Sequence, residues 1–176
     1  MFASVAADGA ERRAARPGDD LLDPADVVMD RAFTVAAAPA AVWPWLVQLG
    51  KQRGGWYLPA AVERFLPPGR RAARDIRPAW QRLAVGDVIP DYGGRDETFE
   101  VAAIEPGSAL VYRSVRGRMN VTWSITLQPV PTGTRVHLRL RLGPVRRQWL
   151  ARTAGELIDA LTIAGMAAGL KERLGG

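Results

Sequence analysis

From residue 85 onward, apolar side chains recur at every second position, and this change of period constrains the fold more than any other feature of the chain. In the clearest run, Met119, Val121 and Trp123 alternate with polar residues. Because successive side chains of a strand point to opposite faces, such alternation predicts half-buried strands. The candidate strands are residues 85–90, 97–104, 109–115, 119–129 and 134–142. We therefore expect a sheet with one apolar face and one solvated face.

Short segments rich in glycine and proline separate these strands. They are Asp91-Tyr92-Gly93-Gly94, Pro106-Gly107-Ser108, Arg116-Gly117-Arg118 and Pro131-Thr132-Gly133. Connections of this length join antiparallel neighbours, whereas parallel strands need long crossovers. The spacing therefore predicts an antiparallel meander of consecutive strands.

One further strand and two short helices are predicted before the meander. Residues 27–35 are mostly β-branched and apolar, which is typical of a strand. Pro39 is suited to the first turn of a helix that Gly50 can end. A second helix opens at Pro59 and stops at Pro67.

A long helix is predicted after the meander. Thr153, with Glu156 three residues on, forms a capping-box pattern that opens a helix to about Leu174. Its apolar stripe is too wide for contact with a flat sheet alone. Gly165 and Gly169 each lower the helix propensity by about 1 kcal/mol relative to Ala. Their missing side chains predict either a close crossing of another segment or space for a ligand.

The length of 176 residues fits one domain, which can bury roughly 70% of its unfolded surface. Residues 1–24 are small, charged and without a period, so we expect a flexible N-terminal tail followed by a single domain at 25–176. Asp8 and Glu11 lie where a signal peptide would need an apolar run, and the longest apolar stretch is too short for a membrane span. We therefore expect a cytoplasmic protein without a transmembrane segment.

The formal net charge of +6 suggests attraction to nucleic acid. Only Lys51 and Lys171 of the 24 basic residues are lysines, and the arginines are spread over several segments. One arginine-rich stretch, residues 70–82, is interpreted as a surface connection, and the sequence does not decide whether it is a lid. Because net charge alone predicts only non-specific attraction, a basic nucleic-acid-binding protein is the weakest alternative, and no specific nucleic-acid partner is expected.

No catalytic residue is predicted. His137 is the single histidine, and strand parity places it on the polar face beside Arg135 and Arg139, where we expect it to be solvated. With no cysteine and one histidine, we expect neither a metal site nor a cofactor. Four carboxylates near one hairpin are better explained by turn formation than by a cation site. They are Asp87, Asp91, Asp96 and Glu97.

The predicted order of elements is that of the helix-grip fold, and a tryptophan-rich motif adds to the likeness. The motif comprises Pro39, Val42, Trp43, Trp45, Leu46, Gln48, Gly50, Arg53, Gly55, Trp56 and Tyr57. It resembles the VWPWLxQxG…RxGWY signature of a bacterial branch of the SRPBCC superfamily, which includes START-like domains, polyketide cyclase/dehydrase proteins and lipid carriers. Val85-Gly86-Asp87, Trp123 and Gly133-Thr134-Arg135 are similar to later landmarks of that family, whereas Leu58-Pro59 departs from it.

The resemblance covers about residue 27 to the C-terminus and implies an α+β, START/Bet v 1-like domain. In this fold a curved antiparallel sheet of about six strands wraps a long C-terminal helix, with two short helices between the first two strands. The resemblance also implies a cavity for a hydrophobic molecule between the sheet and the helix. It does not imply one activity or an oligomeric state.

Aromatic residues are the best candidates for the wall of such a cavity, because they combine apolar contact with a hydrogen-bonding group. We expect Tyr112, Trp123 and Met166 in the wall and Trp56, Tyr57 and Trp80 at the opening, although each would also suit an ordinary core. Arg53 and Arg113 are either rim residues for an acidic ligand group or solvent-exposed.

The leading hypothesis from these residues is a protein that binds, carries or presents a small hydrophobic molecule. The alternative is an enzyme of the polyketide cyclase/dehydrase kind that acts by shaping its substrate.

Overall fold

The computed structural model describes residues 5–94, 96–146 and 148–175, and it contains one six-stranded antiparallel sheet. The strands are β1 (Val27–Val35), β2 (Val88–Pro90), β3 (Thr98–Glu105), β4 (Ala109–Arg116), β5 (Met119–Val130) and β6 (Gly133–Gly143). The helices are α1 (Gly9–Arg13), α2 (Pro39–Gln48), α3 (Ala60–Glu63), α4 (Gln148–Leu150) and α5 (Glu156–Arg173), with 3₁₀ turns at Asp19–Leu21, Pro68–Arg70 and Pro78–Trp80.

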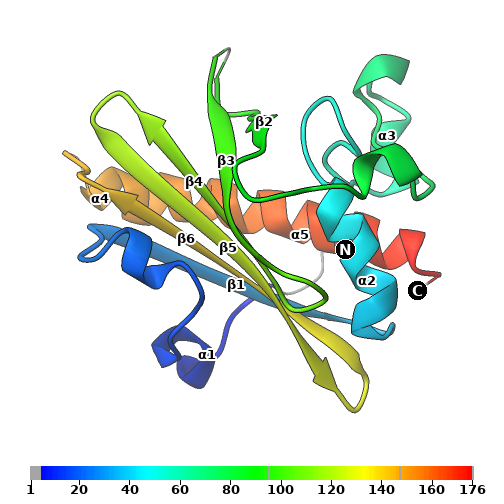
Figure 1. The fold of residues 1–176 in the computed structure, drawn as a ribbon, viewed down its shortest axis with the longest axis horizontal. Helices are drawn as coiled ribbons and strands as arrows, with labels where there is room; N and C mark the ends of the chain where they lie inside the picture. The colour runs from blue at the N-terminus through cyan, green and yellow to red at the C-terminus, as the bar shows by residue number, and fades with distance from the viewer. Residues whose placement is uncertain (1–4, 95, 147, 176) are drawn as a thin grey trace.

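The strand order is β1-β6-β5-β4-β3-β2. Strands β2 to β6 therefore form an antiparallel meander, and β1 pairs with β6 as the edge strand. The sheet curves in front of α5, and α2 and α3 lie at one end of it (Figure 1). The predicted helix-grip fold is confirmed, including its two short helices between the first two strands.

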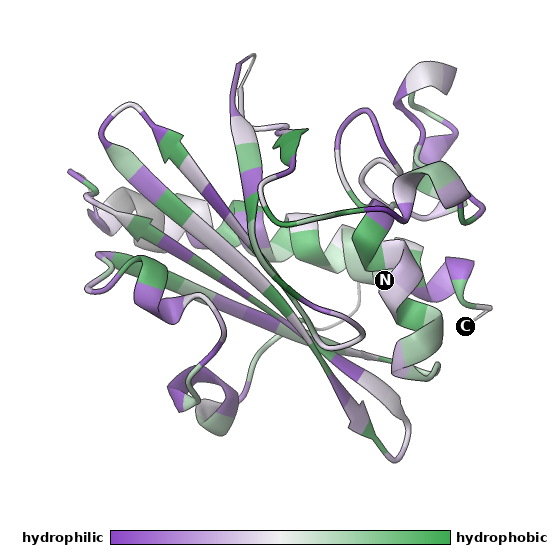
Figure 2. Cartoon of the chain, viewed as in Figure 1, coloured by the Kyte–Doolittle hydropathy of each residue, from purple (hydrophilic) through white to green (hydrophobic). Residues whose placement is uncertain are grey.

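Strand register explains which residues face the helix. Trp123 of β5 pairs with Tyr112 of β4 and Leu140 of β6, so the alternating apolar residues of neighbouring strands share one face. The same alternation is visible as green and purple bands along the strands (Figure 2). This inner face packs against Met166, Leu170 and other residues of the C-terminal half of α5.

The N-terminal half of α5 does not share this packing. Leu157, Ile158 and Leu161 are 62%, 65% and 54% exposed, whereas Met166 and Leu170 are fully buried. The sheet and the helix therefore meet at one end of α5 and separate at the other.

The start of the last helix differs from the sequence prediction. Helical structure already begins in α4 and continues through a π-helical turn, Ala151–Gly155, into α5. Thr153 lies inside this stretch, and its hydroxyl donates to the carbonyl of Trp149 at 2.9 Å. The capping-box prediction is wrong, because a threonine inside a helix can bond the carbonyl four residues back instead of capping.

The two glycines of α5 mark a close crossing of another segment. A Cβ at Gly169 would lie 2.6 Å from backbone atoms of Tyr57 and Leu58, and one at Gly165 would lie 2.8 Å from a Leu58 methyl group. Of the two alternatives predicted for these glycines, the close crossing is confirmed.

The N-terminal segment, residues 5–24, lies on the sheet face opposite α5 (Figure 1). Glu11 pairs with Arg135 at 2.7 Å, Asp19 pairs with Arg139 at 2.7 Å, and the carbonyl of Val5 accepts from the Ala32 amide at 2.9 Å. The hydrogen bond from Arg135 lowers the pKa of Glu11 to about 2. These residues make long-range contacts that a one-dimensional pattern does not reveal, and the flexibility expected of the tail stays a prediction.

This cover also corrects the expected environment of His137. Its parity was predicted correctly, since it lies on the outer face, but it is only 2% exposed and Arg139 is only 4% exposed. The Nε2 atom of His137 lies 3.1 Å from Oδ1 of Asp30, which also accepts from Arg139 at 2.8 Å. The outer face is polar, as predicted, but part of it is buried rather than solvated.

The arginine-rich stretch at 70–82 is anchored to α2 and to the loop that follows it. The buried Gln48 side chain donates to the carbonyl of Asp75 and accepts from the amide of Arg77, both at 3.0 Å. Arg53 donates to the carbonyl of Trp80 at 2.6 Å.

Candidate ligand cavity

A cavity of about 590 Å³ opens where the sheet separates from the N-terminal half of α5. Its floor is the inner face of the sheet, and its sides are α5 and the loops around Leu49–Lys51 and Asp91–Gly93. Tyr92 and Ile158 both line it and are 55% and 65% exposed, so the mouth lies between the 91–93 loop and α5. The volume and the mainly apolar lining are those of a small-molecule site.

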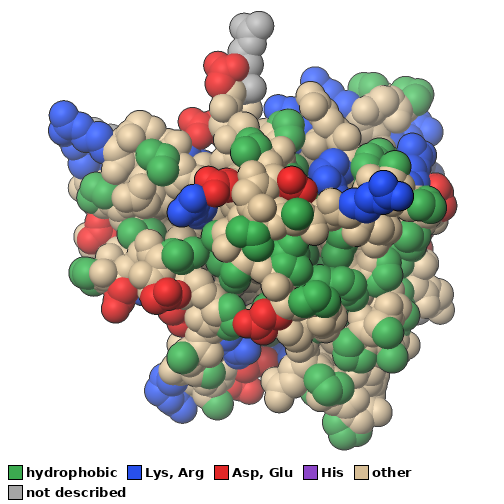
Figure 3. All heavy atoms as spheres, in the orientation of Figure 1, with side chains coloured by type: hydrophobic (Ala, Val, Ile, Leu, Met, Phe, Trp, Pro, Cys, Tyr) green, Lys and Arg blue, Asp and Glu red, His purple; other side chains and the backbone are tan. Residues whose placement is uncertain are grey.

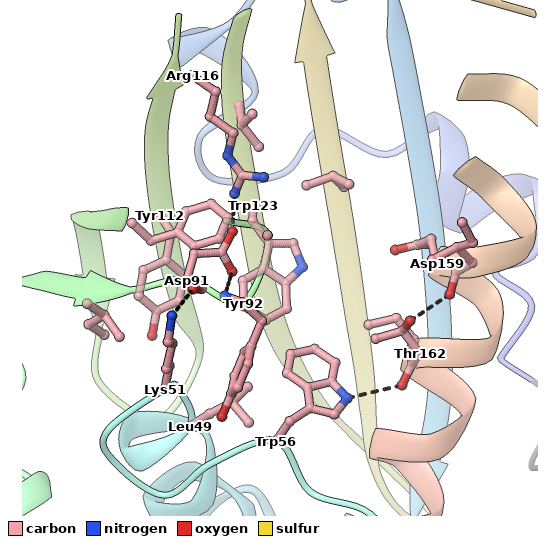
Figure 4. Close-up of a pocket in the computed structure, with 18 of the residues that line it drawn as sticks. Leu49, Lys51, Trp56, Asp91, Tyr92, Tyr112, Arg116, Trp123, Asp159 and Thr162 are labelled. Atoms are coloured by element: carbon pink, nitrogen blue, oxygen red, sulfur yellow. Dashed lines mark hydrogen bonds and ion pairs between the residues drawn. The ribbon is translucent and has the colours of Figure 1, made fainter. Parts of the chain in front are cut away.

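Four aromatic rings form a continuous wall on one side of the cavity. The Trp123 ring stacks on Tyr112 with centroids 5.7 Å apart and on Trp56 with centroids 6.1 Å apart. Phe99 contacts both Tyr112 and Trp123, with centroids 6.0 and 6.1 Å away. The indole nitrogen of Trp56 donates to the carbonyl of Thr162 at 3.3 Å, which joins the wall to α5 across the cavity (Figure 4).

Tyr112 is the deeply buried phenol of this wall, and its burial decides the protonation state of its hydroxyl. Tyr112 is only 3% exposed, and burial raises the pKa of its hydroxyl above the ordinary value. None of the described residues forms a hydrogen bond with this hydroxyl. It is therefore a neutral group in a position to donate or accept one hydrogen bond.

Charged side chains also line the cavity, at two places. Lys51, Asp91 and Arg116 lie near the mouth, where Asp91 and Arg116 form an ion pair (Figure 4). Asp159 projects from α5 and pairs with Arg31 of β1 at 2.8 Å. Burial raises the pKa of Asp159, and the nearby Arg31 only partly opposes this effect.

Three of the six predicted site residues lie together in this cavity. They are Trp56, Tyr112 and Trp123. The inward parity of adjacent strands was enough to find the last two. Their part in binding a ligand stays a prediction.

The other three, Tyr57, Met166 and Trp80, do not line the cavity. Tyr57 is fully buried and donates to the carbonyl of Trp45 at 2.7 Å, and Met166 is fully buried in the core. Trp80 packs under the guanidinium of Arg77, 4.7 Å from its ring centre. The structure therefore places these three side chains outside the cavity lining, because a large side chain near a pocket in sequence can equally pack beside it.

Of the two arginines weighed as either rim or solvent-exposed residues, neither lines the cavity, and the exposed alternative holds for Arg113. Arg113 pairs with Glu100 at 2.6 Å on the outer face, and Arg53 bonds backbone carbonyls. The sequence analysis did not find the charged groups Lys51, Arg116 and Asp159. It missed Phe99 as well, although the alternation of side chains along β3 could have placed Phe99 on the inner face.

A curved antiparallel sheet that grips a long helix over an open apolar cavity defines a helix-grip domain of the SRPBCC superfamily. More narrowly, the chain belongs to the polyketide cyclase / dehydrase and lipid transport family, which it matches over residues 26–175. Among curated proteins, no match was found.

Several solved structures share the fold. Protein MLL2253 from Mesorhizobium loti is 22% identical with a TM-score of 0.51, and the match covers 85% of this chain and 97% of that one. A protein from Rhodobacter sphaeroides is 17% identical with a TM-score of 0.54 and coverage of 88% and 95%. Protein SSP2350 from Staphylococcus saprophyticus is 14% identical with a TM-score of 0.53 and coverage of 85% and 92%. At these identities the likeness shows the fold alone.

The stretch Thr153–Arg173 is long and apolar enough to cross a membrane by length and composition. A core helix passes the same test, and residues 163–167 and 169–170 of this helix are buried in the described structure. The finding is therefore weak evidence for a membrane span.

Proposed function

We propose that this protein binds a small, mostly apolar molecule in the cavity between the sheet and α5. The observation that carries the proposal is the separation of the N-terminal half of α5 from the sheet, which leaves an apolar space of about 590 Å³ open to solvent. Family membership supports it, since the family is described by lipid transport as well as by cyclase and dehydrase activity. The sequence favours a protein that carries or sequesters this molecule inside the cytoplasm.

A dye titration with a cavity-filling variant tests this proposal. Leu140 lines the cavity beside Trp123, its partner on the adjacent strand, so Leu140→Trp places a large ring in the space that the ligand would occupy. The probe is N-phenyl-1-naphthylamine, a neutral dye that fluoresces in apolar surroundings. We expect Leu140→Trp to weaken dye binding by about tenfold or more, equivalent to at least about 1.4 kcal/mol.

Leu21→Trp is the matched control, because Leu21 is 43% exposed and lies in the N-terminal segment outside the cavity. This variant should bind the dye as the wild type does. Equal binding by all three proteins, or none by the wild type, would contradict the proposal. If the dye binds as expected, native mass spectrometry of protein purified from its own host would identify the natural ligand.

Asp159 favours a second candidate function, an enzyme related to the polyketide cyclases and dehydrases. A carboxyl group whose pKa is raised by burial, in a cavity that Tyr112 also lines, is a candidate for proton transfer. If the protein is an enzyme, the molecule that copurifies with Asp159→Asn should differ in mass from the one that copurifies with the wild type.

The nucleic-acid alternative gains no support from the distribution of charge. Many arginines serve internal ion pairs, as Arg139 and Arg173 do, and both of these are almost fully buried. On the face shown in Figure 3, basic side chains gather at the upper right, and the rest of the face carries acidic and hydrophobic side chains with a few basic ones, so no basic surface runs across it. A phosphate backbone would need a continuous basic surface.

A further inference from the structure

Among the described residues, some of the charged groups that line the cavity form ion pairs and one does not. Arg116 pairs with Asp91, and Asp159 pairs with Arg31. Lys51 is the remaining charge, and within the described residues its ammonium group contacts the carbonyl oxygen of Asp91, at 3.1 Å, and no carboxylate within ion-pair distance.

The nearest carboxylate is already occupied. One oxygen of Asp91 binds the guanidinium of Arg116, and the other accepts from the amide of Tyr92 at 2.7 Å. An ammonium group has three N–H donors, and the Asp91 carbonyl uses one of them. Lys51 therefore brings a positive charge and two further donors to the mouth of an otherwise apolar cavity.

The backbone around Lys51 holds it in place. Gly50 and Gly55 exchange two hydrogen bonds, at 3.2 and 2.9 Å, which close the loop that carries it. Gly50 has a φ of 135°, in the region that favours glycine, and a Cβ there would lie 2.9 Å from Ile89. The closed loop fixes where the Lys51 backbone stands at the cavity, so less backbone entropy is lost when a ligand group binds.

From these contacts, and resting on the proposed function, we propose that the cavity selects a flat aromatic molecule with one anionic group, which Lys51 binds at the mouth. The anionic group replaces the carboxylate that Lys51 lacks. The aromatic body lies on the wall of Trp56, Phe99, Tyr112 and Trp123. Trp56 and Tyr112 already stack on Trp123, and these rings offer the same kind of contact to a planar ligand (Figure 4).

Two dyes that differ only in one sulfonate test the anionic part. The neutral dye is N-phenyl-1-naphthylamine, and its anionic counterpart is 8-anilinonaphthalene-1-sulfonate. We expect Lys51→Met to weaken binding of the sulfonate about tenfold and to leave binding of the neutral dye unchanged. Lys51→Arg, which keeps the charge, should restore most of the lost affinity.

The chain supplies a matched control, because its second lysine, Lys171, lies in the last turn of α5 and does not line the cavity. Lys171→Met removes the same charge and should change neither affinity. If both lysine variants weaken the sulfonate equally, the general positive charge of the protein attracts it, and the proposal is overturned. The same holds if Lys51→Met weakens both dyes, since Lys51 would then only support the loop.

Competition between two carboxylates of similar size tests the aromatic part. We expect 2-naphthoate to displace the bound sulfonate dye at a concentration about fivefold lower than decanoate needs. Stronger displacement by decanoate would overturn the planar preference. These outcomes are separable from failure of the proposed function, in which Leu140→Trp would leave the neutral dye bound.

Discussion

The most distinctive residues of the sequence hold the architecture, while the polar chemistry of the cavity comes from inconspicuous ones. Gln48 and Tyr57, from the tryptophan-rich motif, are fully buried and bond backbone carbonyl groups. Lys51 and Asp159 belong to no motif, yet they are two of the charged groups in the cavity lining. A distinctive side chain in such a fold therefore indicates a demanding packing position at least as often as a ligand contact.

At this scale we predict that Asp159→Asn does not destabilise the protein at neutral pH. Burial raises the folded-state pKa of Asp159, so the protonated form favours folding, and this contribution is lost as pH rises through the folded-state pKa. Asparagine resembles the protonated form at every pH. The melting temperature of the variant at pH 7 should therefore equal or exceed that of the wild type, and the difference should disappear in acid.

Asp30→Asn is the control, because the pKa of Asp30 is shifted in the opposite direction to that of Asp159. Burial raises the pKa of Asp30, but the adjacent His137 and the hydrogen bond from Arg139 outweigh this effect and lower it overall. The ionised form therefore stabilises the fold above the unfolded-state pKa, and the variant should melt earlier than the wild type at pH 7. A marked loss of stability in Asp159→Asn would mean that its ion pair with Arg31 dominates.

At the scale of elements, α5 has two roles that divide near its middle. Its C-terminal half is buried among sheet residues and the crossing segment at Tyr57–Leu58, and its N-terminal half forms one side of the cavity. Arg173, at the end of the helix, pairs with Glu63 at 2.6 Å and bonds the carbonyl of Leu58 at 3.0 Å. The packed half therefore fixes the helix so that the other half can stand away from the sheet.

The two glycines of the packed half should respond differently to alanine. At Gly165 the new methyl group meets the end of the Leu58 side chain, which can move, and alanine favours the helix by about 1 kcal/mol, so we expect a change below about 1 kcal/mol. At Gly169 it meets backbone, and we expect a loss of about 2–3 kcal/mol in the free energy of unfolding. Urea unfolding of both variants measures the difference. Equal effects would contradict the close crossing.

At the scale of the whole molecule, the sheet has different cover on its two faces. The inner face meets α5 and the cavity, and the outer face carries the N-terminal segment with its ion pairs to Arg135 and Arg139. Ligand binding and the N-terminal cover are therefore on opposite sides of one sheet.

We predict that deleting residues 1–24 lowers the free energy of unfolding by at least about 2 kcal/mol, because several hydrogen bonds to charged groups are lost. Binding of the neutral dye should persist in the truncated protein. Since the folded-state pKa of Glu11 is about 2, its contribution is present above its ordinary value of 4.5 and is lost as pH falls toward 2. The difference in the free energy of unfolding between the full-length and truncated proteins should therefore decrease as pH falls over that range. Equal stability at neutral pH would favour the mobile tail that the sequence predicted.

Much of the fold could be predicted from the sequence because it depends on local chemistry. The period of two, the short turns and the proline positions act over a few residues, and they placed the strand at 27–35 and the later meander close to their observed bounds. Inward parity also placed Tyr112 and Trp123 on the face that lines the cavity. Neighbouring residues decide these features, so they can be read from the chain directly.

The rest was decided by which distant segments meet. Only the tertiary structure shows that the N-terminal segment buries His137 and that Tyr57 and Met166 turn into the core. It also shows that Lys51 has no carboxylate partner among the described residues. Each of these depends on contacts between residues far apart in the chain, and local periodicity carries no information about such contacts. The sequence by itself determined a sheet and a helix with apolar faces, and the path of the whole chain decided where those faces touch and where they leave a space.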